Sequence, residues 1–217
     1  MKSIYLKITL MAFVAVGSLA CKNTGKEAQI EQEEAAVATE GAVEYVVDTD
    51  NSSIKWEGSK PGTVHYGTIS VASGAVLANN GVVQAGKFAI DMQSIVVEDL
   101  EGEDKARLEA HLTGTIEGKE GDFFNATEYP SAKFEMTGVE NNAVRGNLTI
   151  KDQTHAVEFP ATVTIEGDTL LLKSEAFEID RTKWGVNFGS KSIFPNLGDK
   201  FVSDTMKLTV SLQATKA

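Results

Sequence analysis

The stretch from residue 143 to residue 166, AVRGNLTIKDQTHAVEFPATVTIE, contains the pattern that decides the fold. Apolar and polar side chains alternate along both of its halves, and a turn signal at Asp152-Gln153 separates them. The apolar positions are Val144, Leu148, Ile150, Val157, Phe159, Val163 and Ile165, and Arg145, Asn147, Glu158, Thr162 and Thr164 stand between them. A period of two indicates antiparallel strands that each bury one face. We therefore predict a β-hairpin here.

The same alternation recurs on both sides of this hairpin, at residues 132–136 and 206–212. Short turn signals separate the apolar runs, as in hairpins; they are Asn79-Asn80-Gly81, Asn141-Asn142 and Gly167-Asp168. The segment Leu170–Ile179 changes phase, which predicts a bulge or a strand that is buried on both faces. Consecutive hairpins of long strands predict an all-β fold, an antiparallel up-and-down barrel of about eight strands. A two-sheet sandwich remains the alternative, because periodicity does not separate the two.

One segment has a helical pattern. Glu103–Leu112 carries Leu108 and Leu112 four residues apart and is followed by Gly114, a plausible helix C-cap. His111 lies on this predicted short helix, and we expect it to be exposed.

The first 20 residues have the features of an export signal. Lys2 and Lys7 precede an apolar stretch, and small residues precede Cys21. The apolar stretch is about a dozen residues long, whereas a membrane span needs about 20, so a transmembrane anchor is the weaker alternative. The sequence before Cys21 resembles the lipobox of bacterial lipoproteins, which implies lipid attachment at Cys21. We expect a lipoprotein signal peptide over 1–20, the lipidated Cys and a flexible acidic tether over 21–44, and the barrel over 45–217.

Charge and composition exclude several functional classes. The net charge is −11 and no Lys/Arg-dense run occurs, so we expect no nucleic-acid binding. The single Cys excludes an internal disulfide. His65, His111 and His155 lack metal-ligand spacing, and neither G-x-S-x-G nor H-E-x-x-H occurs. The sequence therefore predicts no enzyme, no catalytic residue, no metal and no cofactor, and a hydrolase is only a distant alternative.

Five segments resemble motifs of the YceI-like domain family. Residues 122–134, DFFNATEYPSAKF, are similar to F-(D/N)-x-x-x-(Y/F)-P-x-A-x-F, and residues 145–151, RGNLTIK, to G-x-L-T-(I/L)-(K/R)-G. Residues 177–186, FEIDRTKWGV, are similar to F-x-(I/L)-(D/N)-R-x-x-(F/W)-G-(V/I), residues 65–67 to the early H-x-G, and residues 200–204 to the turn before the closing strand. Asp152 replaces the usual turn Gly, and His155 replaces a basic residue. The matches run in order from about Val46 to Ala214.

The resemblance implies a lipocalin-like barrel in the bacterial cell envelope, on the periplasmic side, that binds a polyisoprenoid or similar amphiphile such as an isoprenoid diphosphate or quinone. An apolar barrel could bind such a chain through the hydrophobic effect alone, because each CH₂ that is buried contributes about 0.8 kcal/mol. The candidate lining residues are Phe88, Ile90, Met92, Phe134, Met136, Phe159, Phe177, Trp184 and Phe188. His65 and Arg181 are candidates for contacting the head group. Arg181 could instead form an internal ion pair or clamp a loop carbonyl, His65 could instead satisfy a backbone carbonyl in the core, and each lining residue could simply be packed core.

The expected partners are a long-chain isoprenoid and a membrane, reached through the N-terminal lipid anchor, and a homodimer is left open. Two other functions remain. One is a structural or interaction barrel with a filled core, and the other is an accessory that presents quinone to a membrane redox enzyme. A cavity of a few hundred Å³ would favour the carrier, because ligand sites are about 300–1,000 Å³.

Overall fold

The computed structural model describes residues 32–217, so the predicted signal peptide and Cys21 lie outside the described residues. Eleven strands, one α-helix and three short 3-10 helices make up the described part. The strands are β1 (Val43–Val47), β2 (Ser53–Lys60), β3 (Thr63–Asn79), β4 (Val82–Asp91), β5 (Val96–Val97), β6 (Ser131–Glu140), β7 (Ala143–Ile150), β8 (Gln153–Glu166), β9 (Thr169–Ser174), β10 (Phe177–Asp180) and β11 (Thr205–Lys216). The helices are η1 (Met92–Ser94), α1 (Gly102–Thr113), η2 (Arg181–Trp184) and η3 (Gly198–Lys200).

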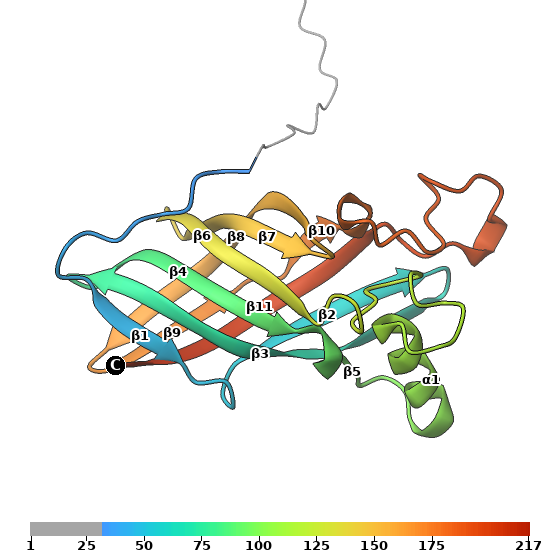
Figure 1. The fold of residues 1–217 in the computed structure, drawn as a ribbon, viewed down its shortest axis with the longest axis horizontal. Helices are drawn as coiled ribbons and strands as arrows, with labels where there is room; N and C mark the ends of the chain where they lie inside the picture. The colour runs from blue at the N-terminus through green and yellow to red at the C-terminus, as the bar shows by residue number, and fades with distance from the viewer. Residues whose placement is uncertain (1–31) are drawn as a thin grey trace, which may run out of the picture.

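Eight of the strands close into a ring, in the order β11-β2-β3-β4-β6-β7-β8-β9, and β9 pairs with β11 to complete it. Every pairing is antiparallel, and neighbours in the ring are mostly neighbours in the sequence (Figure 1). The predicted antiparallel barrel is therefore confirmed, and the sandwich alternative is wrong. Closure pairs both edges of each ring strand, which removes the exposed edges of an open sheet. The remaining strands β1, β5 and β10 extend the ring at its two ends.

The turn signals are confirmed with one shift. Asn80 and Gly81, and then Asn141 and Asn142, adopt positive φ between paired strands. In the hairpin quoted first, the positive-φ residues are Lys151 and Asp152, one position earlier than predicted, and Gln153 already belongs to β8. Asn and Asp tolerate the left-handed region better than most residues, which explains how Asp152 can occupy this turn.

The phase change within Leu170–Ile179 has a different cause from the predicted bulge or doubly buried strand. The segment is two strands, β9 and β10, separated by Glu175 and Ala176. Both strands pair with β11, at different heights along the barrel. Because of this break, the inward-facing positions of β9 and β10 do not follow one continuous alternation. Leu172 and Ile179 are therefore both buried although they are an odd number of residues apart.

Helix α1 is confirmed within a residue of its predicted limits. Gly114 follows it in the left-handed conformation, and its N–H caps the carbonyls of Ala110 and His111. The buried face of α1 is small, and Leu112 is its only side chain in the core. Figure 1 shows α1 at one end of the barrel, where the loop between β10 and β11 also projects.

Residues 33–40 lie against the outside of the barrel without forming a strand or helix. The backbone of Glu33 exchanges hydrogen bonds with the side chain of Asn147 on β7, at 3.1 and 2.7 Å. The N–H of Thr39 donates to Gln84 on β4. The boundary between a tether and the barrel at residue 44 stays a prediction, but this part of the predicted tether contacts the sheet.

Candidate functional site

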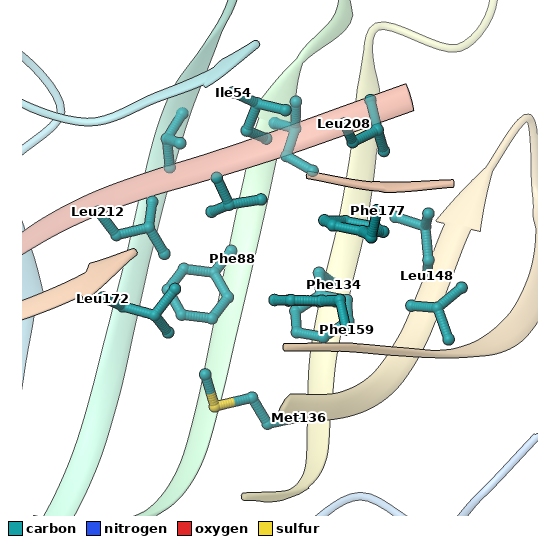
Figure 2. A pocket seen from close by; sticks show the side chains of 14 residues that line it. Ile54, Phe88, Phe134, Met136, Leu148, Phe159, Leu172, Phe177, Leu208 and Leu212 are labelled. Atoms are coloured by element: carbon teal, nitrogen blue, oxygen red, sulfur yellow. The ribbon is translucent and has the colours of Figure 1, made fainter. Parts of the chain in front are cut away.

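The inward-facing side chains line an entirely apolar cavity of about 70 Å³ near the middle of the barrel. Its 14 lining residues come from strands all around the ring (Figure 2); they are Ile54, Val71, Phe88, Ile90, Phe134, Met136, Leu148, Val157, Phe159, Leu172, Phe177, Leu208, Val210 and Leu212. A void of this size and polarity is expected to stay dry, because a water molecule there would lack hydrogen-bond partners. It is also well below the volume of an ordinary ligand site.

A row of four phenylalanine rings crosses this interior. The ring centroids of Phe88 and Phe134 are 6.2 Å apart, those of Phe134 and Phe159 are 5.7 Å apart, and those of Phe159 and Phe177 are 4.4 Å apart. Gly146 makes room for this row, because the ring of Phe134 lies over its Cα and a Cβ there would clash. The ring of Phe134 thus occupies space against the barrel wall that a side chain at position 146 would otherwise fill.

Two further hollows lie beyond the cavity, toward the end of the barrel that carries α1. The nearer one, which we call the throat, has a volume of about 50 Å³, and Trp56, Ile69, Arg181 and Met206 are among the residues that line it. These side chains stand two residues from cavity-lining ones on the same strands: Trp56 follows Ile54, Ile69 precedes Val71 and Met206 precedes Leu208. The throat therefore lies directly beyond the cavity along the barrel.

The outer hollow, which we call the mouth pocket, has a volume of about 490 Å³. It shares Trp56, Gly58, Leu112, Phe123 and Val202 with the throat. Its rim adds Lys60, His65, His111, Phe188 and Lys200. The mouth pocket is thus apolar at its base and polar at its rim, and its volume falls within the usual range for ligand sites.

Both histidines of the mouth pocket are paired with aspartates. His65 Nδ1 lies 2.8 Å from Asp99 Oδ2, and His111 Nε2 lies 2.7 Å from Asp122 Oδ2. Burial acts to raise the pKa of Asp99, but the N–H of Tyr66 and the contact with His65 outweigh it and hold that pKa below its usual value. The expectation that His111 is exposed is wrong, because its ring packs edge-on against Phe123 and Phe188.

The early H-x-G motif also has a structural explanation. Gly67 pairs with Val97 of the short strand β5, and a Cβ at Gly67 would collide with the carbonyl of Val96. The indole of Trp56 lies beside Gly67, and its Nε1 is buried without a hydrogen-bond partner among the described residues. A buried donor left unsatisfied costs about 1–3 kcal/mol, so an acceptor on a ligand would be favourable here.

Arg181 holds the loop between β10 and β11. Its side chain is 4% exposed and donates to the carbonyls of Val186, Phe188, Val202 and Ser203. Burial lowers its pKa from the usual value, while the charges of Asp204 and Asp180 oppose that change. Because four hydrogen bonds go to loop carbonyls, the geometry favours the clamp over contact with a head group.

The predicted lining residues fall into three groups. Phe88, Ile90, Phe134, Met136, Phe159 and Phe177 line the central cavity. Phe188 lies at the mouth pocket, as does His65. Met92 and Trp184 are buried in the core and line none of the hollows described above; the indole of Trp184 donates to the carbonyl of Leu148 instead. Whether any of them contacts a ligand stays a prediction.

Sequence reasoning missed most of the throat and mouth. Trp56 could have been found, since it alternates with Ile54 on a strand. Phe123 and Leu112 could not, because they come from a loop and a helix that meet only in the folded chain. Among residues 32–217 no group of three His, Cys, Asp or Glu side chains could hold a metal ion, and no helix is long and apolar enough to cross a bilayer.

The comparisons with known proteins agree with this architecture. The family model described as YceI-like domain matches residues 45–214. A UPF0312 protein of Pseudomonas putida (strain W619) is 26% identical over 184 residues, which cover 81% of this chain and 88% of that protein.

Two solved structures share the fold. BcnA of Burkholderia cenocepacia has a TM-score of 0.55 at 23% identity and covers 78% of this chain and 99% of its own. A polyisoprenoid binding domain from Saccharophagus degradans, implicated in plant cell wall breakdown, has a TM-score of 0.54 at 13% identity and covers 81% of this chain and 99% of its own.

Proposed function

Because this chain belongs to the family of YceI-like domain proteins, we propose that it binds a polyisoprenoid or a similar amphiphile, with the tail in the barrel and the polar head in the mouth pocket. One observation carries the proposal: mouth pocket, throat and central cavity follow one another along the barrel and become wholly apolar toward its middle. The similarity to a polyisoprenoid binding domain supports the same ligand class.

Binding of a long tail requires the interior to widen. The central cavity of about 70 Å³ and the throat of about 50 Å³ share no lining residue, and we expect side chains such as those of Trp56 and Met206 to lie between them. Rotation of such side chains would join the hollows. Each CH₂ that enters contributes about 0.8 kcal/mol, which offsets the cost of the rearrangement.

The head group has suitable partners at the mouth pocket. Lys60 and Lys200 outnumber Asp199 among the charged residues that line it, and His65 lines the same pocket. The buried indole N–H of Trp56, which has no partner among residues 32–217, supplies a further donor. These groups suit an anionic or oxygen-rich head, such as a diphosphate or a quinone ring.

A second function is favoured by the small central cavity. A barrel filled by its own side chains would be a structural or interaction module, and about 70 Å³ is closer to a filled core than to a ligand site. The carrier is the better-supported function because the mouth pocket is large and shares five lining residues with the throat, which lies next along the barrel.

The proposed setting is the periplasmic side of the bacterial cell envelope, with Cys21 as the lipid anchor. Cys21 stands 11 residues before Gln32 (32 minus 21). A fully extended chain spans at most about 3.6 Å per residue, so the anchor allows the barrel a reach of about 40 Å. A carrier held at that distance stays close to the membrane, where isoprenoid lipids reside.

The proposal is tested by solvent extraction and mass spectrometry of protein purified from its own host. A variant that narrows the passage is Gly58→Leu. Gly58 lines both throat and mouth pocket, and a Cβ there meets no atom within 4 Å, so the larger side chain enters open space. Gly121→Leu is the matched control, because Gly121 is exposed, lines none of these hollows and is equally unobstructed.

We expect an isoprenoid-type lipid with the wild-type protein and with Gly121→Leu, and much less with Gly58→Leu. The absence of any lipid from the wild-type protein would overturn the proposal. Equal lipid in all three proteins would also overturn it, because the ligand would then lie outside the barrel.

A further inference from the structure

The loop between η2 and β11, residues 187–203, projects beyond the end of the barrel (Figure 1). We call it the mouth loop, because Phe188, Lys200 and Val202 border the mouth pocket. Two neighbouring large apolar side chains, Ile193 and Phe194, are 42% and 45% exposed on it. Adjacent exposed apolar side chains on a projecting loop indicate a contact surface.

The mouth loop is held in shape by specific hydrogen bonds. Arg181 clamps the carbonyls of Phe188 and Val202, and the N–H of Val202 donates to the carbonyl of Gly189 at 2.8 Å. The N–H of Phe194 donates to the carbonyl of Ser190 at 2.9 Å. These backbone groups of the loop are therefore paired within the protein, and the exposed apolar side chains stand on a fixed support.

Charge around the mouth loop differs from that of the chain as a whole. Lys191 and Lys200 oppose the single Asp199 within the loop, and Lys60 lies on the same rim, whereas the whole chain has a net charge of −11. Helix α1, across the mouth pocket, is acidic together with its N-cap residue Glu101; Glu101, Glu103, Asp104 and Glu109 oppose Lys105 and Arg107. An anionic surface would thus attract the mouth loop and repel α1.

We infer that the mouth loop is the surface through which the protein contacts an anionic lipid bilayer, with Ile193 and Phe194 entering the interface. Apolar side chains beside lysines are the combination by which proteins lie on anionic membranes. This membrane contact rests on the proposed function. A nearly insoluble isoprenoid could then pass from the bilayer to the mouth pocket without crossing water. The predicted anchor at Cys21 would keep the barrel near the membrane, and the mouth loop would turn the mouth pocket toward it.

The test places a fluorescent reporter on the mouth loop. Phe194→Trp keeps an aromatic side chain, and the signal of the natural Trp56 and Trp184, which are 6% and 2% exposed, is subtracted by measuring the wild-type protein with the same vesicles. Val82→Trp is the control, because Val82 is 62% exposed and follows the β3–β4 turn at the opposite end of the barrel. The full chain, with the N-terminus its host produces, is mixed with vesicles of phosphatidylethanolamine and phosphatidylglycerol that include a brominated phospholipid.

We expect the added fluorescence of the Phe194→Trp variant to shift to shorter wavelength and to be quenched by the brominated lipid, and that of the Val82→Trp variant to stay unchanged. Vesicles of phosphatidylcholine alone should quench the Phe194→Trp variant much less. In the Phe194→Trp background, Lys191→Gln should raise the phosphatidylglycerol concentration needed for half-maximal quenching by about fivefold, and Lys216→Gln, at the other end, should not.

The inference is overturned if the reporter on the mouth loop is not quenched by any of the vesicles, or if the two reporter variants are quenched equally. A protein would then be the partner that contacts the mouth loop. The lipid that co-purifies with Ile193→Ser/Phe194→Ser is measured separately. Neither residue lines the mouth pocket, so a stable variant that still carries lipid supports both proposals when Ile193→Ser in the Phe194→Trp background also weakens the quenching of the reporter. Quenching of the loop reporter in a protein that carries no lipid would support the membrane contact and overturn the proposed function.

Discussion

Leu172→Ala tests whether the barrel interior is a packed tube with a small void. Leu172 is 1% exposed, lines the central cavity and stands on β9 between Val163 of β8 and Leu212 of β11 (Figure 2). The substitution removes three carbon atoms, which costs about 2.4 kcal/mol at about 0.8 kcal/mol each. The cavity already holds about 70 Å³, so the new space joins an existing void instead of closing.

The enlarged void adds a second contribution. If it grows by about 50 Å³, the added cost is about 1.2 kcal/mol at about 24 cal/mol per Å³. The free energy of unfolding should therefore fall by about 3–4 kcal/mol. For a domain of this size that corresponds to a fall in Tm of about 6–16 °C.

The assay is equilibrium unfolding in urea, followed by tryptophan fluorescence, with calorimetry for the Tm. Leu171→Ala is the matched control, because Leu171 immediately precedes Leu172 on the same strand, faces outward and lines no part of the cavity. It should cost no more than about 1 kcal/mol. Equal losses in the two variants would refute the assignment of inner and outer faces, and with it the barrel interior as the binding space.

Three further predictions concern residues that hold the barrel interior and the mouth pocket in shape. Arg181→Ala should lower the free energy of unfolding by about 3–5 kcal/mol in urea titrations, because four loop carbonyls and Asp204 lose their partner; a loss below about 1 kcal/mol would contradict the clamp. Gly146→Ala should destabilise by about 1–3 kcal/mol, since its Cβ would lie 2.6 Å from the carbonyl oxygen of Glu135 and would collide with Phe134, whereas Gly58→Ala should be tolerated; similar melting temperatures for both would count against this packing. The folded pKa of Asp99 lies below its unfolded value of about 3.8, so its carboxylate stabilises the fold above that pH and this stability is lost as the pH falls through the lower folded pKa. Asp99→Asn should therefore make the free energy of unfolding depend less steeply on pH at acid pH, as measured by urea titrations at several pH values. An unchanged pH dependence would show that other carboxylates determine it.

The sequence was sufficient to predict most of the strands, the turns and the short helix. Alternation such as that of Phe134 and Met136 is a local property, and it follows directly from the pleat of a strand. The turn residues carry their own signals, because Asn, Asp and Gly tolerate positive φ. Those local signals also allowed six of the cavity-lining residues to be named from the inward faces of their strands.

The tertiary structure alone decided what lies at the barrel end. Arg181 was predicted as a head-group contact with a loop clamp as its alternative, and only the fold brings the carbonyls of Val186 and Ser203 to it. His111 meets Phe188 although 77 residues separate them (188 minus 111). Such contacts depend on how the loop, the helix and strand β2 converge, which no periodicity encodes. The volume left inside the barrel likewise depends on side-chain packing over the whole ring, because a sequence that marks a side chain as inward does not say how completely its neighbours fill the space around it.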